Sequence, residues 1–428
     1  MKTKETRYRF IYVFVIAVLL LLIILSEVVL AQPRPGDLFR EYVCKTPDKP
    51  GNQVYLRVGG RLDYRVTPDN YPDLVITNGT VSFGQSVELT NAIRAEVTIE
   101  KMLCHDGTSN LRISLNGTPE IVFPESPNIP EPQNRYMHHF YPTVEIPLSA
   151  LKQGPGNYFS LQVDSVHPWR WPQNLVYGVI LRVYYAPSAK GFDGQLVAKQ
   201  ESEEKLKLEL QCKNAWDIQS VDFITRFDGP DWDGDGIYND WHYHYHRGEL
   251  VNHAGTASEA PFQTEWDLGW VPDQTEPVQL SARVLYTSGL IAMVTPVSFS
   301  LKRESYSVHF CKPEKVEEKW LTRSGEKKQE FVFTGDPAKI KDARMMFTSW
   351  SPGYLNGIYI NDFVVCISEG SKYSHMQHQI PIENLKIFRN GVNVLKTGKT
   401  PKYQGKMVHG AEIMWPGIMV LIKTSTKK

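Results

Sequence analysis

Short apolar blocks separated by turn-forming residues fill the chain from Gln53 onward, and this pattern restricts the fold more than any other feature. Within a block, apolar and polar residues alternate or run together for a few positions, and Gly, Pro, Asn and Asp bound the blocks. Such blocks are typical of β-strands, and strands at this spacing without intervening helices indicate sandwiches or jelly rolls. Strands are expected at 54–58, 87–98, 111–115, 158–163 and 175–185.

The first 31 residues have the pattern of an export signal. Basic residues precede an unbroken apolar run at 10–25, and Val29 and Ala31 fit the small residues before a cleavage point. We expect a secreted, periplasmic or cell-surface protein, with the segment either cleaved after Ala31 or kept as an anchor, which would be its only contact with a membrane. Residues 32–49 are expected to form a linker, with one helical turn at 37–43 capped by Asp37.

Charge and cysteine content exclude some classes of protein. Lys plus Arg equals Asp plus Glu at 47 each, so there is no overall positive field, and nucleic acid is not an expected partner. The five cysteines lie far apart and never in a C-x-x-C pair. We expect mostly buried single thiols, and one disulfide remains an open alternative.

An internal repeat divides the chain. Five landmarks recur in one order: an Ile-rich strand ending in Asn, a Tyr-x-His stretch, an Ile-Pro edge, a Gly/Asn turn and a Trp-Pro pair before a last strand. The first copy has them at 113–117, 136–139, 146–151, 156–157 and 171–172, and the second at 358–361, 373–378, 380–385, 391–393 and 415–416. The landmarks predict two related modules, 50–188 and 312–424. These turn and edge signatures resemble the galactose-binding-like jelly roll of carbohydrate-binding modules.

A different module is expected at 192–305. Its stretches at 221–224, 253–256, 260–267, 270–273 and 278–284 resemble the immunoglobulin-like domains of secreted bacterial glycoside hydrolases. An insertion after Ile224 departs from that pattern. The expected fold is therefore all-β, with two related jelly-roll β-sandwiches flanking an immunoglobulin-like β-sandwich.

The insertion contains a pattern typical of a calcium loop. Carboxylates at alternate positions surround a hard cation, a glycine allows the tight turn, and a carbonyl and an amide complete the set; the residues are Asp231, Asp233, Asp235, Gly236, Ile237 and Asn239. The pattern resembles the loops of EF-hands and dockerins, except that His242 stands where an acidic ligand belongs, so Asp228 or Asp240 would have to substitute. The alternative is an acidic, Gly-rich hairpin without an ion.

Three histidines follow at alternate positions, His242, His244 and His246. On a strand they would share one face, and two of them could hold zinc or copper together with another ligand such as His253. The alternative is a polar strand face opposite a core lined by tyrosines.

Other candidate ligand-binding residues lie in the two jelly rolls: His138, His139, Trp169, Trp171 and Trp415. The tryptophans of the first copy would either stack on a sugar or seal the end of the sandwich. Trp415 occupies the corresponding place in the second copy, which favours a shared structural role.

The resemblances favour an extracytoplasmic, non-catalytic protein that binds polysaccharide or glycan or recognises a surface. Paired jelly rolls are also similar to peptide-N-glycanase amidases and to copper monooxygenases. Copper monooxygenases have a His-His pair and a His-x-His pair, and His138-His139 and His242-x-His244 of this chain resemble these pairs. A structural or adhesive surface protein is the third alternative.

Overall fold

The computed structural model divides the chain into two units, residues 1–34 and 35–428, and the strands that the structure describes lie in the second. The described residues are 33–45, 55–58, 64–67, 76–77, 80–103, 108–165, 174–186, 192–322, 325–351, 357–366, 370, 375–398, 402–403, 406–407 and 412–426. The expected export signal, Trp169 and Trp171 lie outside them. None of the described helices is long and apolar enough to cross a membrane.

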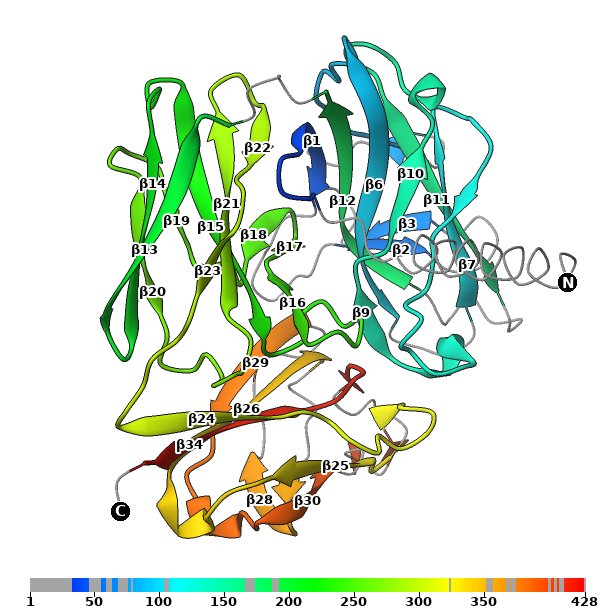
Figure 1. Ribbon diagram of the computed structural model, residues 1–428. Helices are drawn as coiled ribbons and strands as arrows, with labels where there is room; N and C mark the ends of the chain where they lie inside the picture. The colour runs from blue at the N-terminus through cyan, green and yellow to red at the C-terminus, as the bar shows by residue number, and fades with distance from the viewer. Residues whose placement is uncertain are drawn as a thin grey trace, which may run out of the picture. The chain divides into compact units, whose positions relative to one another are not determined.

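The first sandwich packs two sheets against each other (Figure 1). Long antiparallel strands β6 (Ala92–Leu103) and β12 (Asn174–Tyr185) lie at the centre of one sheet, flanked by β2 (Tyr55–Val58), β3 (Tyr64–Thr67), β9 (His138–Phe140) and β10 (Thr143–Ile146). The other sheet contains β4 (Ile76–Thr77), β5 (Thr80–Ser82), β11 (Tyr158–Ser165), β7 (Thr108–Leu115) and β8 (Ile121–Val122). Alternate side chains of both sheets face inward, so Val97 and Leu181 join Ile113 and Phe159 in one buried cluster.

The middle sandwich has a three-stranded sheet of β13 (Gly194–Ser202), β14 (Lys205–Cys212) and β20 (Gln263–Asp267). The facing strands are β15 (Ile218–Asp228), β16 (Asn239–His242), β19 (Gly255–Ala257), β21 (Val278–Tyr286), β22 (Ile291–Met293) and β23 (Val297–Phe299). A separate hairpin pairs β17 (His244–His246) with β18 (Glu249–Val251).

The last sandwich packs β24 (Tyr306–Cys311), β34 (Met419–Ser425), β26 (Ile340–Trp350), β29 (His375–Pro381) and β33 (Glu412–Ile413) against β25 (Lys328–Phe333), β30 (Gly391–Thr397), β27 (Ile358–Ile360) and β28 (Phe363–Cys366). A short ladder joins β31 (Lys402–Tyr403) to β32 (Lys406–Met407). The helical elements with described bounds are single 3₁₀ turns at Gln133–Arg135, Leu148–Ala150, Pro337–Lys339 and Leu385–Ile387. The expectation of an all-β fold of sandwiches is confirmed.

The segment expected to be a linker with a helical turn is instead strand β1 (Leu38–Lys45), so that expectation was wrong. All eight residues pair with β12, and Leu38 and Phe39 also pair with β22. Pairing on both edges satisfies the backbone and buries Phe39. One continuous sheet therefore runs from the first sandwich through β1 into the middle one, and Asp37 pairs with Arg94 instead of capping a helix.

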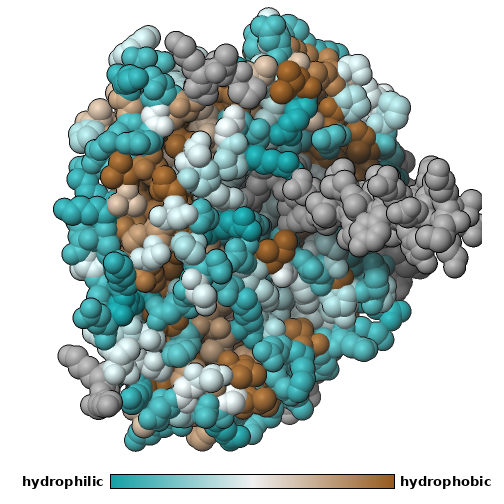
Figure 2. Space-filling view, in the orientation of Figure 1, coloured by the Kyte–Doolittle hydropathy of each residue, from teal (hydrophilic) through white to brown (hydrophobic). Residues whose placement is uncertain are grey.

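Smaller apolar clusters join each pair of sandwiches. Met102 and Tyr177 pack with Trp350 and Met414, and two further clusters connect the first sandwich to the middle one and the middle one to the last. Hydrophilic residues cover most of the face shown in Figure 2. Among the described cysteines, Cys44, Cys311 and Cys366 are buried and Cys212 is partly exposed, and Cys44, Cys212 and Cys311 are free thiols.

Candidate metal centre

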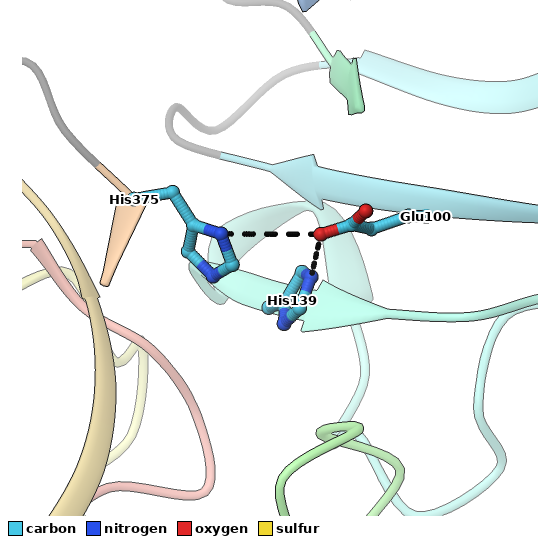
Figure 3. Close-up of side chains that lie close together, drawn as sticks. All are labelled: Glu100, His139 and His375. Carbon is cyan, nitrogen blue, oxygen red and sulfur yellow. Dashed lines mark hydrogen bonds and ion pairs between the residues drawn. The ribbon is translucent and has the colours of Figure 1, made fainter. Parts of the chain in front are cut away.

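Three side chains from distant parts of the chain converge on one point. Glu100 comes from β6, His139 from β9 and His375 from β29, and one ligand atom of each lies within 4.8 Å of the other two. Figure 3 shows both imidazoles directed at the Glu100 carboxylate. Strand pairing places the first two side by side, because Lys101 is opposite Phe140 and Met102 is opposite His139 in the β6–β9 ladder.

A third histidine, His246 of the hairpin strand β17, completes the group. Oε1 of Glu100 lies 2.8 Å from Nδ1 of His246, 3.2 Å from Nε2 of His139 and 3.9 Å from Nδ1 of His375. Oε2 accepts the backbone N–H of Arg247 at 2.7 Å. The Glu100 side chain is fully buried, whereas that of His246 is 29% exposed, so the centre meets solvent at His246.

Aromatic rings enclose these polar groups. The Tyr141 ring lies 4.9 Å from that of His139, and the Tyr177 ring stacks on His375 at 5.3 Å. The Arg247 guanidinium lies over the Tyr177 ring, 4.8 Å from the ring centroid. The effective dielectric constant is lower among buried aromatic rings than in water, so electrostatic interactions between Glu100 and a bound cation would be stronger here.

Burial and charge act in opposite directions on the ionisable groups. Burial alone would raise the pKa of Glu100, but the interactions with His246 and His139 outweigh it and hold the pKa below its ordinary value. Burial lowers the pKa of His139 and of His375. Both imidazoles are therefore neutral at pH 7, which is the protonation state that ligates metals.

The donor set fits a transition metal ion. Imidazole nitrogens and a carboxylate are ligands of zinc and copper, and zinc–nitrogen bonds of about 2.0–2.1 Å put neighbouring ligand atoms roughly 3.4 Å apart in a tetrahedron. The distances of 2.8–3.9 Å from Oε1 of Glu100 bracket that value. Nδ1 of His139 has no hydrogen-bond partner within the described part of the chain. The alternative is a metal-free, hydrogen-bonded cluster.

The structure separates the three histidines of the His-x-His-x-His run. Strand β16 ends at His242, which stacks on Phe227 at 3.8 Å and whose Nε2 lies 2.9 Å from the carbonyl oxygen of Phe227. Nε2 of His244 faces the amide nitrogen of Gln377 at 2.8 Å, so that nitrogen is already engaged. Only His246 reaches Glu100, and the suggested ligand His253 instead pairs with the Thr256 hydroxyl at 2.7 Å. The three histidines therefore lie on two strands, β16 and β17, and contact different partners.

The candidate ligand residues of the jelly rolls are buried. His138 and His139 point to different partners: Nδ1 of His138 lies 3.0 Å from the carbonyl of Tyr136, and its Nε2 lies 3.5 Å from Glu125. His138, His139 and Trp415 are at most 8% exposed. This burial does not fit an open sugar-stacking surface made from these three residues.

The acidic loop brings its carboxylates together as the pattern indicated. One oxygen each of Asp231, Asp233 and Asp235 lie within 4.8 Å of one another. Burial raises the pKa of all three, and the neighbouring carboxylates add to the rise for Asp233 and Asp235. Ile237 donates its N–H to Asp235, and Asn239 is exposed at the start of β16. Of the suggested substitutes, Asp228 pairs with Lys312 at 2.7 Å instead.

Sequence reasoning missed Glu100 and His375. A charged residue inside an otherwise apolar strand block was one available signal, since Glu100 follows Ile99 in β6. The other was the repeat itself, because the landmark that aligns 136–139 with 373–378 already contained both His139 and His375.

No family model matches the sequence, and no curated protein matches it either. Among solved structures, a β-porphyranase of glycoside hydrolase family 86 from the human gut bacterium Bacteroides plebeius is 14% identical, with a TM-score of 0.22 over 56% of this chain and 38% of that one. The glycoside hydrolase domain of Endo-D from Streptococcus pneumoniae R6 is 10% identical, with a TM-score of 0.27 over 61% and 37%. The chain thus spans less than half of either structure, and likeness at these scores identifies neither a family nor an activity.

Proposed function

We propose that this protein binds a transition metal ion, zinc or copper, outside the cytoplasm, at the centre formed by Glu100, His139, His246 and His375. The observation that carries the proposal is the convergence of a buried carboxylate, Glu100, and two imidazoles, His139 and His375, within 4.8 Å, with His246 hydrogen-bonded to the same carboxylate oxygen. An ionised carboxylate has about four lone-pair sites, and when it is buried these need partners. Here it faces three imidazole nitrogens as well as a backbone N–H.

An ion at this centre would join all three sandwiches. Glu100 and His139 belong to the first, His246 to the hairpin in the middle part of the chain and His375 to the last. Binding to the folded chain and not to the unfolded one stabilises the fold by an amount that grows with ion concentration. The tyrosines around the ligands would shield the ion from water except on the side of His246.

Titration with Co²⁺ in excess Ca²⁺ tests the proposal, because Ca²⁺ occupies oxygen-rich sites and leaves nitrogen ligands to Co²⁺. We expect one equivalent per chain, visible as ligand-field absorption bands, with competition by Zn²⁺. The variant His375→Gln should weaken binding at least tenfold. Its matched control is His378→Gln on the same strand, since His378 is also buried but bonds to Ser349 at 2.8 Å, outside the centre.

Equal Co²⁺ affinity in wild type and His375→Gln would overturn the proposal, provided that circular dichroism shows both proteins folded. Glu100→Gln gives a second reading. Glutamine has the size of glutamate but no charge, so Glu100→Gln should also weaken Co²⁺ binding. It keeps the proposal testable if His375→Gln does not fold.

Glycan recognition is the second candidate function, favoured by the surface residue Trp216 between β14 and β15. Its side chain is 84% exposed, and a flat, open indole is suited to stacking on a sugar ring. A glycan array probed with wild type and with Trp216→Ala tests this candidate. Binding lost in the variant supports it, and Ile93→Ala, at another exposed apolar residue, is the control.

A further inference from the structure

A second cluster lies beside the centre, in the turn that joins β15 to β16. Oδ1 of Asp231 accepts the N–H of Gly234 at 2.6 Å, and Oδ2 accepts that of Gly236 at 2.8 Å. These bonds curl the chain so that the carboxylates of Asp233 and Asp235 turn toward that of Asp231. Both glycines have positive φ values, 71° and 82°, which other residues rarely adopt.

One oxygen in this turn is left without a partner. Oδ1 of Asp235 accepts the N–H of Ile237 at 2.6 Å, but Oδ2 is buried and makes no hydrogen bond within the described ranges. The residue is 0% exposed. A buried carboxylate oxygen without a donor costs free energy unless a proton or a cation compensates it. Nearby Asp231 and Asp233 add negative charge, so a cation is the better match.

The turn also packs against the strand that carries His139. A Cβ atom on Gly234 would lie 1.8 Å from the carbonyl oxygen of His139, so the two backbones touch. On the other side, the backbone carbonyl of Asp235 accepts hydrogen bonds from Ser126 at 2.6 Å and from Asn128 at 2.9 Å. The turn of the middle sandwich is thus held directly against the first one, next to a ligand of the centre.

We propose that the turn at 231–236 binds a hard divalent cation through Asp231, Asp233 and Asp235, and that this cation holds the turn against His139 and so tightens the neighbouring centre. The oxygen-only donor set selects Ca²⁺ or Mg²⁺ over softer metals, with water completing the coordination. The cation site stands on the turn alone. Its effect on the centre rests on the proposed function.

Tb³⁺ luminescence tests the cation site independently of the centre. Tb³⁺ replaces Ca²⁺ in oxygen sites, and Trp232 stands between Asp231 and Asp233 in the chain, so its indole is placed to sensitise the emission. We expect a saturable signal that Ca²⁺ displaces, and at least a tenfold loss of affinity in Asp235→Asn and in Asp233→Asn. The control is Asp228→Asn in the same hairpin, because Asp228 is paired with Lys312. Equal Tb³⁺ affinity in wild type and both turn variants would overturn the site.

The coupling needs a second titration. Co²⁺ affinity of the histidine centre, measured with and without Ca²⁺, should rise about fivefold or more with Ca²⁺ in the wild type and stay unchanged in Asp235→Asn. Ca²⁺ binding without any change in Co²⁺ affinity refutes the coupling but leaves the cation site standing. Retained Tb³⁺ binding in a wild type that takes up no Co²⁺ refutes the proposed centre instead.

Discussion

Asn116 donates from Nδ2 to Oδ1 of Asn157 at 2.8 Å, and Asn361 makes the same bond to Asn393 at 2.7 Å in the last sandwich. In both pairs the first asparagine has a φ near 50° and accepts the backbone N–H that follows the second. Both pairs fall on landmarks of the sequence repeat. Two strands of each sandwich are thus joined by one and the same side-chain network.

Replacing the second asparagine of either pair should destabilise its sandwich. Asn157 and Asn393 are almost fully buried, and Asn157→Ala or Asn393→Ala leaves several buried backbone groups without partners. We expect a loss of about 1–3 kcal/mol in the free energy of unfolding, measured by urea denaturation. Asn390→Ala, which removes only an exposed contact of 3.3 Å to Gly335, should cost less than about 0.5 kcal/mol.

Glu41 of β1 connects the first and middle sandwiches through two arginines. Its carboxylate lies 2.8 Å from Arg182 and 2.7 Å from Arg283, and all three side chains are less than 10% exposed. Glu41→Gln leaves buried positive charge undercompensated, so we expect about 3 kcal/mol of destabilisation in chemical denaturation.

The exposed pair Lys205 and Glu265, 2.7 Å apart, gives the comparison for that variant. Glu265→Gln should change stability by less than about 1 kcal/mol, because water screens the pair. Equal losses in the two variants would show that the buried network contributes no more than a surface ion pair.

Stability should fall on acidification partly because of His378. Burial lowers the pKa of His378 to about 4, below the value of about 6.5 in an unfolded chain. Between these values the unfolded state binds more protons, so stability drops as pH falls from about 6.5 to 4, by up to about 3 kcal/mol. Thermal denaturation over this range should show a shallower pH dependence in His378→Gln, and parallel curves would contradict the assignment.

Thiol alkylation should distinguish the described cysteines. Burial raises the pKa of Cys44 and Cys311 to about 12, whereas Cys212 is partly exposed. The thiolate is the reacting form, so iodoacetamide at pH 8 should label Cys212 well before the other two in the folded protein. Peptide mass spectrometry reads the order, and labelling of Cys44 at the rate of Cys212 would be the contrary result.

The fold was largely predictable because strand patterning is local. The blocks at 111–115 and 175–185 became β7 and β12, since alternation and long apolar runs report burial directly. Strand β1 (Leu38–Lys45) was missed because the short segment 37–43, with Asp37 as a possible cap, fits a helical turn as well as a strand. Only its pairing with β12 and β22, far along the chain, decides between them.

The candidate centre was only partly predictable because its members meet through tertiary packing. His139 and His246 were recognised as ligand types, but the signals for Glu100 and His375, a charge inside an apolar strand and a repeat landmark, did not show that these side chains meet His139 and His246. The Asp231, Asp233 and Asp235 cluster was easier, because a single tight turn brings its members together and all of its spacing is local.

The order of the ligand residues along the chain determines when the histidine centre can form during synthesis. During synthesis Glu100 and His139 appear first, the hairpin with His246 follows, and His375 comes only after two sandwiches have been made. Contacts between such distant segments form slowly, because long loops must close first. A chain that stops before β29 has a carboxylate and two imidazoles but not the last donor, so enclosure of an ion would be a late event that marks a finished molecule.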